Sequence, residues 1–427
     1  MTTTELNRRK QILVAVDIAK ARHDVLAELP DGTRKRMIIK NQLIDFNRLS
    51  DYLRSFDSEV TIGIEPTADY HRNLAHFLKL QNFNVRFLSS ISVARTREAL
   101  HNSWDKNDPK DAQVILHLMK TGITQYFYDP VVEGTNDIQE ISNTHFQISL
   151  RKVKLQHSLL NHYLPLYFPE AEAFLCATRA GWFAKLLNHF PLPSMVTTFQ
   201  KDDFIEQAAK LLPSKHSKRA MLDSFYEAAA NSVGIRVPAD SHAVSMFRLT
   251  LKQHLDLCAK RAELEELSHS ILKENVNYKI LRSVPGIGPI IALTVLAEAG
   301  DLRRFGHERQ FLKYCGLDLS TQQSGYFRGS SKISKRGNGR LRSALWLAAG
   351  IAVRMQENSF RNKFSRYIQR DPTDKDLKRK AMTACSAKMA RVVYGLIKHQ
   401  QFYRSYHEEA VPGGRTRSHG PLELLTP

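Results

Sequence analysis

Residues 12–18 read Ile-Leu-Val-Ala-Val-Asp-Ile, an apolar run that one acid, Asp17, interrupts near its end. A short apolar run of this kind is typical of a buried β-strand. Burying an ionised carboxylate is unfavourable unless an opposite charge neutralises it, and a divalent cation is a common partner. A second apolar run, residues 60–64, is followed directly by Glu65. The two runs predict acids at the ends of two buried strands.

The sequence around these runs alternates between strand and helix patterns from about residue 10 to residue 130. The expected strands are residues 12–18, 23–29, 34–39, 60–64 and 84–88, and the expected helices are residues 43–56, 69–80 and a segment from Asp108 onward. A turn at residues 30–32, Pro-Asp-Gly, predicts a hairpin between the second and third strands. The periodicity indicates an α/β domain, and its order of elements is that of a ribonuclease-H-like fold.

Two further acids, Asp108 and Asp111, stand three residues apart at the expected start of a helix. Residues three apart share one helix face, so both side chains can complete a site with Asp17 and Glu65. Phosphodiester chemistry commonly uses two Mg²⁺ ions about 4 Å apart. Since Mg²⁺ prefers carboxylate and water oxygens, we predict a Mg²⁺ site formed by these four acids.

The acids of the expected helix also have a purely structural explanation. An aspartate cap, a proline at the first helical position and an acid near the positive end of the helix dipole all stabilise a helix start. Asp108, Pro109 and Asp111 supply these three features. Asp105 is a competing acid in the same loop. The pair alone therefore fits either helix capping or metal binding.

The remainder of the chain reads as mainly α-helical. Residues 135–275 carry leucine, alanine and charge at helical spacing, which predicts long helices and a coiled-coil pair, either as a spacer or as a dimerisation element. A less regular insert is expected near residues 177–243, where prolines recur. Residues 277–400 form a third, mostly helical region, and residues 401–427 read as a flexible basic tail.

A glycine turn opens the third region. Residues 284–289 read Val-Pro-Gly-Ile-Gly-Pro and precede an apolar helix, the form of a helix-hairpin-helix. Gly286 and Gly288 would let backbone N–H groups approach a DNA phosphate at the positive end of the next helix. A tight helical turn without a ligand is the alternative.

The second candidate site is a basic loop rich in glycine and serine at residues 314–342. No acid lies between Asp318 and Glu357, and the loop supplies Arg328, Lys332, Lys335, Arg336, Arg340 and Arg342 as candidate nucleic-acid contacts. Such a loop can hold a phosphate backbone, although a solvated flexible loop is also compatible with the pattern. A serine nucleophile is possible there, but the loop's serines cannot be ranked from their chemistry alone.

The composition favours a polyanionic partner. The 427 residues carry 62 Lys and Arg against 43 Asp and Glu, a net charge of +19. Nucleic acid is the first candidate. A membrane surface is the rival partner, but no apolar run approaches the roughly 18 to 20 residues needed to span a membrane. The first residues do not resemble a secretory signal. Four widely spaced cysteines without a Cys-x-x-Cys pair predict free thiols in a reducing cytoplasm and no structural zinc.

Several motifs resemble the transposases of the insertion-sequence-110 family, described as bridge-RNA-guided recombinases. The N-terminal motifs are Val-Asp-Ile-Ala-Lys at 16–20, Gly-Ile-Glu-Pro-Thr at 63–67 and Lys-Asn-Asp-Pro-Lys-Asp-Ala at 106–112. The C-terminal motifs are Val-Pro-Gly-Ile-Gly-Pro at 284–289, Tyr-Cys-Gly-Leu at 314–317, Gln-Ser-Gly at 323–325 and Ile-Ser-Lys-Arg-Gly-Asn at 333–338. They follow one another in the order typical of the family, and the middle region matches only as helical.

This resemblance implies a RuvC-like domain with an Asp-Glu-Asp-Asp (DEDD) tetrad, a coiled coil, and a helical transposase domain with a nucleophilic serine. Carried over by motif, the tetrad is Asp17, Glu65, Asp108 and Asp111, and the serine is Ser324. The resemblance implies that Ser324 attacks a DNA phosphate to form a phosphoserine link, assisted by metal ions, expected to be two Mg²⁺, held by the acids. It further implies a noncoding guide RNA and a homo-oligomer, a dimer or tetramer, whose protomers can share active sites. The expected location is the nucleoid in a bacterial or archaeal cytoplasm.

Two other functions remain compatible with the residues. A structure-specific nuclease, such as a Holliday-junction resolvase, would use the same four acids with water as the nucleophile. A non-catalytic nucleic-acid-binding protein would need only the positive charge and the hairpin. A nuclease should still cleave DNA after Ser324→Ala, whereas a recombinase should lose strand exchange. A binding protein should keep its biological activity after Asp17→Ala.

Overall fold

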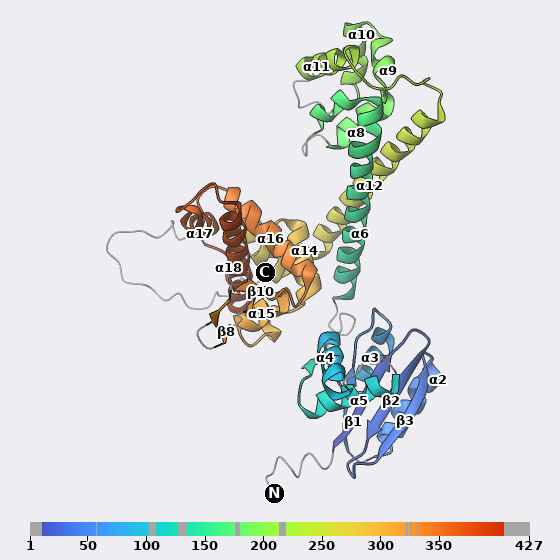
Figure 1. The fold of residues 1–427 in the computed structure, drawn as a ribbon, viewed down its shortest axis with the longest axis vertical. Helices are drawn as coiled ribbons and strands as arrows, with labels where there is room; N and C mark the ends of the chain where they lie inside the picture. The colour runs from blue at the N-terminus through green and yellow to red at the C-terminus, as the bar shows by residue number, and fades with distance from the viewer. Residues whose placement is uncertain are drawn as a thin grey trace, which may run out of the picture. The chain divides into compact units, whose positions relative to one another are not determined.

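The computed structural model divides the chain into two compact units, Met1–Asn136 (unit 1) and Asp137–Pro427 (unit 2), coloured along the chain in Figure 1. The described residues are 11–56, 58–101, 108–126, 135–175, 180–212, 219–320, 323–324, 327–329 and 331–404.

Unit 1 is built on one six-stranded sheet with the strand order β3-β2-β1-β4-β5-β6. Its strands are β1 (Gln11–Ile18), β2 (Arg22–Glu28), β3 (Arg34–Lys40), β4 (Glu59–Ile64), β5 (Asn84–Phe87) and β6 (Gln125–Tyr126). Strands β1, β4 and β5 are parallel, whereas β2, β3 and β6 each run antiparallel to a neighbour. The parallel core therefore brings the carboxyl ends of β1 and β4 to the same edge of the sheet.

Helices cover both faces of this sheet, because the side chains of each strand alternate between two apolar cores. The helices are α2 (Leu43–Arg54), α3 (His71–Leu80), α4 (Ser90–His101) and α5 (Asp108–Lys120). Val14 and Val16 of β1 pack into the core formed with α2 and α3. Leu13 and Ala15 face the opposite core, which α4 and α5 complete. Odd-numbered positions of β1 therefore face α4 and α5.

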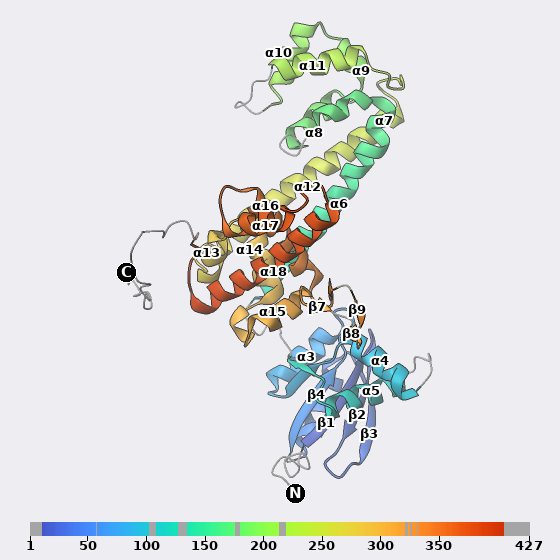
Figure 2. The ribbon, with the colours of Figure 1, turned by 60° about the vertical axis from the view of Figure 1, so that its left-hand side comes forward.

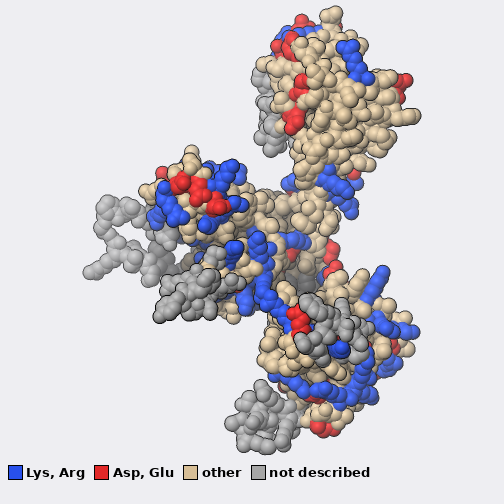
Figure 3. Space-filling model, viewed as in Figure 1, with Lys and Arg blue, Asp and Glu red and all other residues tan. Residues whose placement is uncertain are grey.

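The structure confirms the predicted N-terminal α/β domain and its strands. The expected strands at 12–18, 23–29, 34–39, 60–64 and 84–88 correspond to β1 to β5 within one or two residues, and the expected helices correspond to α2, α3 and α5. Sequence analysis missed α4 and the two-residue strand β6. Edge strand β3 is unusually basic, with Arg34, Lys35, Arg36 and Lys40, and Figure 3 shows Lys and Arg gathered on unit 1. Such charges oppose edge-to-edge pairing between sheets.

Unit 2 is mostly helical, as predicted. One of its cores joins the C-terminal helices α13 (Val276–Ser283), α14 (Pro289–Ala299), α15 (Glu308–Cys315), α16 (Gly339–Arg354), α17 (Ser359–Ile368) and α18 (Lys375–His399). Side-chain caps begin several of these helices: Asn275 accepts from the Tyr278 N–H, and Asn338 accepts from the Leu341 N–H. Such caps satisfy N–H groups that a helix start otherwise leaves unpaired.

The middle of the chain contains two long helices, α6 (Asn136–Ser158) and α12 (His242–Leu272), which lie side by side in Figures 1 and 2. His145 of α6 contacts Glu265 of α12, with 3.2 Å between His145 Nε2 and Glu265 Oε1. Arg261 donates from Nε to the same carboxylate at 2.8 Å. The long helices are confirmed, whereas the coiled-coil assignment stays a prediction.

In the region expected to hold a less regular insert, near residues 177–243, the described helices are shorter than α6 and α12. The described residues there form α8 (Ala180–His189), α9 (Pro193–Thr197), α10 (Lys201–Ala209) and α11 (Arg219–Ala230). Their core is aromatic, with Phe183, Phe204 and Phe225 fully buried. Pro193 begins α9, and Pro191 and Pro238 lie in connections, where proline is tolerated; Pro213 lies outside the described residues.

None of the helices in the described part of the chain is long and apolar enough to cross a lipid bilayer. Cys258, Cys315 and Cys385 are free thiols, as predicted, and Cys176 lies outside the described residues.

Candidate active-site residues

Asp17 and Glu65 lie at the same edge and on the same face of the sheet in unit 1. The parallel register pairs Val16 of β1 with Ile64 of β4, so each acid follows directly after one member of this pair. Asp17 is an odd-numbered residue of β1, and the alternation places it on the face covered by α4 and α5. Ile62 and Ile64 of β4 face the other core, so Glu65, the next residue after β4, lies on the face covered by α4 and α5. Both acids are half-buried.

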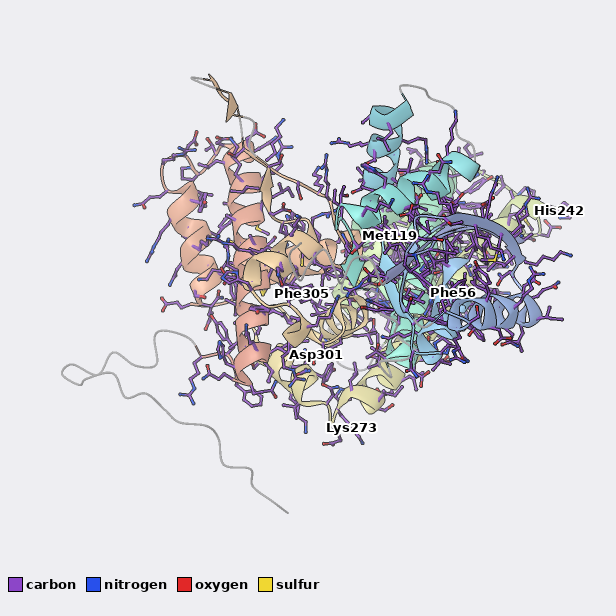
Figure 4. All side chains as sticks on the ribbon, turned by 90° about the horizontal axis from the view of Figure 1, so that it is seen from below. Phe56, Met119, His242, Lys273, Asp301 and Phe305 are labelled. Atoms are coloured by element: carbon purple, nitrogen blue, oxygen red, sulfur yellow. The ribbon has the colours of Figure 1, made fainter. Side chains whose placement is uncertain are left out.

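Helix α5 packs closely on this face because Gly63 of β4 has no side chain. A Cβ atom at Gly63 would overlap the Sδ atom of Met119, which is labelled in Figure 4. The first turn of α5 contributes Asp111, whose side chain is 1% exposed and forms an ion pair with Arg97 of α4. Since isolated buried charges are strongly unfavourable, Arg97 is the group that neutralises Asp111 in this structure. Asp111 is therefore buried rather than an exposed acid at a helix start.

Three of the four predicted acids, Asp17, Glu65 and Asp111, have described side chains. Within the described residues, no three His, Cys, Asp or Glu side chains lie close enough to hold one metal ion. Asp108 is the first residue of α5, and its side chain lies outside the described part. The structure thus places Asp17, Glu65 and Asp111 on elements that share one face, and the predicted metal site itself stays untested.

An acid that sequence analysis missed, Asp24 of β2, lies directly opposite Asp17 in the antiparallel register. Residues opposite each other on one sheet face are close enough for like charges to repel. Arg36 of β3 offsets this repulsion, because its Nε donates to Asp24 Oδ1 at 2.8 Å. Asp24 is therefore held by an arginine of the sheet.

Ser324 lies in a small antiparallel ribbon of unit 2 rather than in an irregular loop. The ribbon contains β7 (Leu319–Ser320), β8 (Gln323–Ser324), β9 (Phe327–Arg328) and β10 (Lys332–Ile333). Strand β7 pairs with β10, and β8 pairs with β9 so that Ser324 is opposite Phe327. Figures 1 and 2 both show this ribbon beside α15. We call residues 317–338 the serine hairpin. The side chain of Ser324 lies outside the described part.

The predicted basic contacts of the serine hairpin and the start of α16 fall into two groups. Lys332, Lys335 and Arg336 are exposed. Arg342 is half-buried, and its Nη1 donates to the backbone oxygens of Cys315 at 3.1 Å and Lys335 at 3.3 Å. Arg340 also points inward, toward Glu298. The side chain of Arg328 lies outside the described residues. Among the basic side chains that the structure describes here, the exposed group is the one directly available to a ligand.

The two glycines between α13 and α14 differ in their surroundings. Gly286 has φ +86°, and a Cβ atom there would overlap the backbone oxygen of Ala348 in α16. Gly288 is the N-cap of α14, and the nearest atom to a Cβ there is Arg282 Nη1 at 4.0 Å. The structure therefore explains Gly286 by packing and leaves room at Gly288. A tight turn between two helices is present, and its role as a helix-hairpin-helix stays a prediction.

Besides Asp24, sequence analysis overlooked two further charged residues, Arg97 and Glu298. Glu298 interrupts the apolar run of α14, the same signal that marked Asp17 in β1, and could have been found in that way. Arg97 had no comparable signal, because the helix that carries it was not predicted.

Comparison with known proteins identifies the family. A model for the DEDD transposases of IS110 matches residues 14–169, which include Asp17, Glu65, Asp108 and Asp111. A second model, described as the transposase IS116/IS110/IS902 family, matches residues 278–365, which include Gly286, Gly288 and Ser324. The chain belongs to the IS110 family of transposases. It is accordingly a DNA transposase, an enzyme of DNA recombination, and the predicted family is confirmed.

Individual relatives of this transposase support the family with modest identity. A protein assigned as the transposase of the IS117 mini-circle of Streptomyces coelicolor is 25% identical over 80% of this chain and 84% of its own length. The transposase of insertion sequence element IS1111A from Coxiella burnetii is 31% identical over 33% of this chain and 38% of its own length. Thermus thermophilus RuvC, solved with a Holliday-junction substrate, covers 27% of this chain and 99% of its own at 8% identity, and a TM-score of 0.20 does not establish a shared fold.

Proposed function

We propose that this transposase cuts and rejoins DNA by using Ser324 as the nucleophile and the four acids of unit 1 as ligands of divalent metal ions. The observation that carries the proposal is the shared face of Asp17, Glu65 and Asp111, three acids from β1, the end of β4 and α5. A purely structural domain has little reason to place two half-buried carboxylates and a fully buried one on neighbouring elements of one face. Asp108, at the start of α5, would be the fourth ligand.

The chemistry of these donors suits Mg²⁺, which prefers carboxylate oxygens. Asp111 is paired with Arg97 in this structure, so a metal ion held by Asp111 would have to replace or share that cationic partner. Two bound Mg²⁺ ions would supply charge stabilisation at the phosphate and at the leaving oxygen. The protein's own contribution is to hold Asp17 and Glu65 on paired strands and to exclude water from Asp111 under α4.

Ser324 would act in a substitution at phosphorus. Its Oγ gives up its proton to solvent and forms a bond to a DNA phosphorus, the bond from that phosphorus to the ester oxygen of one strand breaks, and the departing oxygen takes up a proton to become a DNA hydroxyl. Because one phosphodiester replaces another, the DNA–protein link retains the energy needed for rejoining. Attack by a second DNA hydroxyl on the phosphoserine would release Ser324 and restore a DNA strand.

Nucleic acid would bind through the exposed cations of the serine hairpin and through the turn before α14. Lys332, Lys335 and Arg336 are exposed, and Gly288 leaves the N-terminus of α14 open to a phosphate. We further propose the domain assignment of the sequence analysis: a RuvC-like domain at 10–130, a coiled-coil region at 135–275 and a transposase domain with a helix-hairpin-helix at 277–400. Assembly as a homo-oligomer and guidance by a noncoding RNA belong to the same proposal.

The proposal is tested by substituting Ser324 and an acid separately in the full chain. Ser324→Ala should abolish both the covalent DNA–protein adduct and strand exchange, and the exposed Ser331→Ala should leave both unchanged. A structure-specific nuclease would continue to cleave DNA when Ser324 is replaced. A non-catalytic binding protein would keep its biological activity in an Asp17→Asn variant. Either of these two results would reject the proposed function.

The proposed guide RNA has its own experiment. The chain is purified from cells that carry the DNA flanking its gene, and the RNA that copurifies is sequenced. We expect one RNA transcribed from that flanking DNA, enriched over total cellular RNA. Recovery of bulk RNA in cellular proportions would contradict guidance.

A further inference from the structure

Glu298 and Arg340 form a half-buried ion pair next to the base of the serine hairpin. Glu298 is in the last turn of α14, where its side chain is 9% exposed, and its Oε1 lies 2.8 Å from Arg340 Nη1. Its other oxygen, Oε2, accepts a hydrogen bond from Asn338 Nδ2 at 2.6 Å. One carboxylate therefore holds two residues at the point where the hairpin ends and α16 begins.

The same arginine reaches a third element, helix α6. Arg340 Nη2 donates to the backbone oxygen of Ser142 at 3.0 Å and to Ser142 Oγ at 2.9 Å, and Nη1 donates to Asn143 Oδ1. The guanidinium also lies over the ring of Phe146, 4.8 Å from its centroid. Both terminal nitrogens of Arg340 are thus occupied by protein atoms. A guanidinium held in this way is poorly placed to bind a DNA phosphate.

Tight backbone packing connects this ion pair to the hairpin. The Asn338 N–H donates to the backbone oxygen of Tyr314 at 2.7 Å, and the Tyr314 hydroxyl donates to the backbone oxygen of Glu298 at 2.7 Å. Gly337 has φ +150°, and a Cβ atom there would lie 2.7 Å from the Gly316 nitrogen. From this base the Lys335 N–H donates to the backbone oxygen of Gly316, and β10 pairs with β7. The contacts form a continuous path from Glu298 to β7 and β10, the strands that flank the β8–β9 pair with Ser324.

We propose that Glu298 and Arg340 are positioning residues that fix the serine hairpin on α14 and α6. Their role is to hold the strand that carries Ser324, and neither residue touches the reacting atoms. The proposal rests on the proposed function only in its catalytic consequence, since the hold on the hairpin exists whichever residue is the nucleophile. It also assigns Arg340 a role different from the nucleic-acid contact predicted from the sequence.

The substitution Arg340→Lys tests this role, because it keeps the positive charge and removes the planar fork that contacts Glu298 and Ser142 at once. The matched control is Arg303→Lys, which alters an exposed arginine paired with Asp301 at 2.9 Å in the same unit. Asp301 is labelled in Figure 4. Hydrogen exchange of residues 317–338 is measured in the full chain without DNA. We expect exchange of the Lys335 and Asn338 amides to rise about tenfold in Arg340→Lys and to stay unchanged in the control.

The second measurement separates positioning from DNA binding. Binding and adduct formation are followed with a labelled duplex that carries the DNA flanking the gene, in the presence of the copurifying RNA. We expect Arg340→Lys to keep the Kd within about twofold and to slow adduct formation at saturating DNA by about 10- to 100-fold, as a misplaced nucleophile requires. A weaker Kd with an unchanged saturated rate would identify Arg340 as a phosphate contact and overturn the proposal.

Two further results keep the proposal falsifiable. If Arg340→Lys does not fold, the double variant Glu298→Gln/Arg340→Gln removes both charges, and unchanged hydrogen exchange of the hairpin in it would reject the positioning role. If the unaltered protein forms no serine adduct at all, the proposed function fails, while hydrogen exchange still decides whether Glu298 and Arg340 hold the hairpin.

Discussion

The acids of unit 1 and the serine of unit 2 are held in place in different ways. Asp17 and Glu65 end neighbouring parallel strands, and apolar residues on both sheet faces fix those strands. Ser324 ends a two-residue strand, and the base of its hairpin is tied to the rest of unit 2 by polar contacts around Glu298. A regular core distributes its support over many side chains. The hairpin depends on a few long-range contacts, so single substitutions should displace it more easily.

The largest effect is expected at the acids. Asp111→Asn should slow DNA cleavage by about 10³-fold, equivalent to about 4 kcal/mol of transition-state stabilisation. The matched control is Asp24→Asn, an acid on the same sheet face that Arg36 already holds. Cleavage rates are measured with Mg²⁺ after circular dichroism has shown that each variant is folded. Equal rates in the two variants would show that Asp111 is not part of the catalytic site.

The two glycines before α14 should separate packing from ligand binding. Gly286→Ala forces a positive φ on alanine and a collision with the Ala348 backbone, so the free energy of unfolding should fall by about 2–4 kcal/mol. At Gly288 the nearest atom to an added Cβ is Arg282 Nη1 at 4.0 Å, an ordinary van der Waals distance. Gly288→Ala should therefore change the free energy of unfolding by less than about 1 kcal/mol. Chemical denaturation measures both variants. Similar destabilisation by the two substitutions would refute this distinction.

The exposed cations of the serine hairpin should affect binding rather than stability. Replacing Lys332, Lys335 and Arg336 together by alanine should weaken DNA binding about tenfold or more. The slope of log K against log salt should become shallower by up to about 0.9 for each DNA phosphate that these side chains neutralise. Fluorescence anisotropy at several salt concentrations gives both quantities. A salt slope equal to that of the unaltered protein would mean that these side chains face solvent in the complex.

The smallest effect is a dependence of stability on pH. Burial lowers the pKa of His23, His145 and His254 below the ordinary value of about 6.5. Each group binds its proton more readily when the chain unfolds, so stability should be fully present above pH 6.5 and should decrease as the pH falls below it. The slope is at most about 1.4 kcal/mol per pH unit for each histidine. Thermal unfolding between pH 5 and 8 measures it, and a melting temperature that rises on acidification would contradict the expectation.

The comparison also explains which features were predictable from the sequence. The strands of unit 1 were predicted because β1 and β4 are apolar runs that end at an acid, a signal carried by adjacent residues. Helix α4 was missed because its apolar positions are few, and Arg97 was missed with it. The contact between Arg340 and Ser142 joins residues far apart in the sequence, so no local pattern could show it. The basic residues of the hairpin looked equivalent, and only the fold separates Arg340 and Arg342 from Lys332 and Lys335.

The insert of the middle region shows again that contacts between distant residues cannot be predicted from local sequence. Its prolines predicted a less regular segment between the long helices, but no local pattern showed that helices α8 to α11 share a core around Phe183, Phe204 and Phe225. Proline marks where a helix cannot continue, and it does not indicate whether short helices on either side share a core. Tertiary packing therefore decided this region.

The most direct test of the central claim is to identify the residue that bears the covalent link to DNA. The full chain, with Mg²⁺ and its copurifying RNA, is reacted with DNA that carries the flanking sequence, digested with protease and nuclease, and analysed by mass spectrometry. We expect the nucleotide remnant on the peptide that contains Ser324, at Ser324, and its absence in Ser324→Ala. A remnant on another residue, or an adduct that persists in Ser324→Ala, would contradict the account.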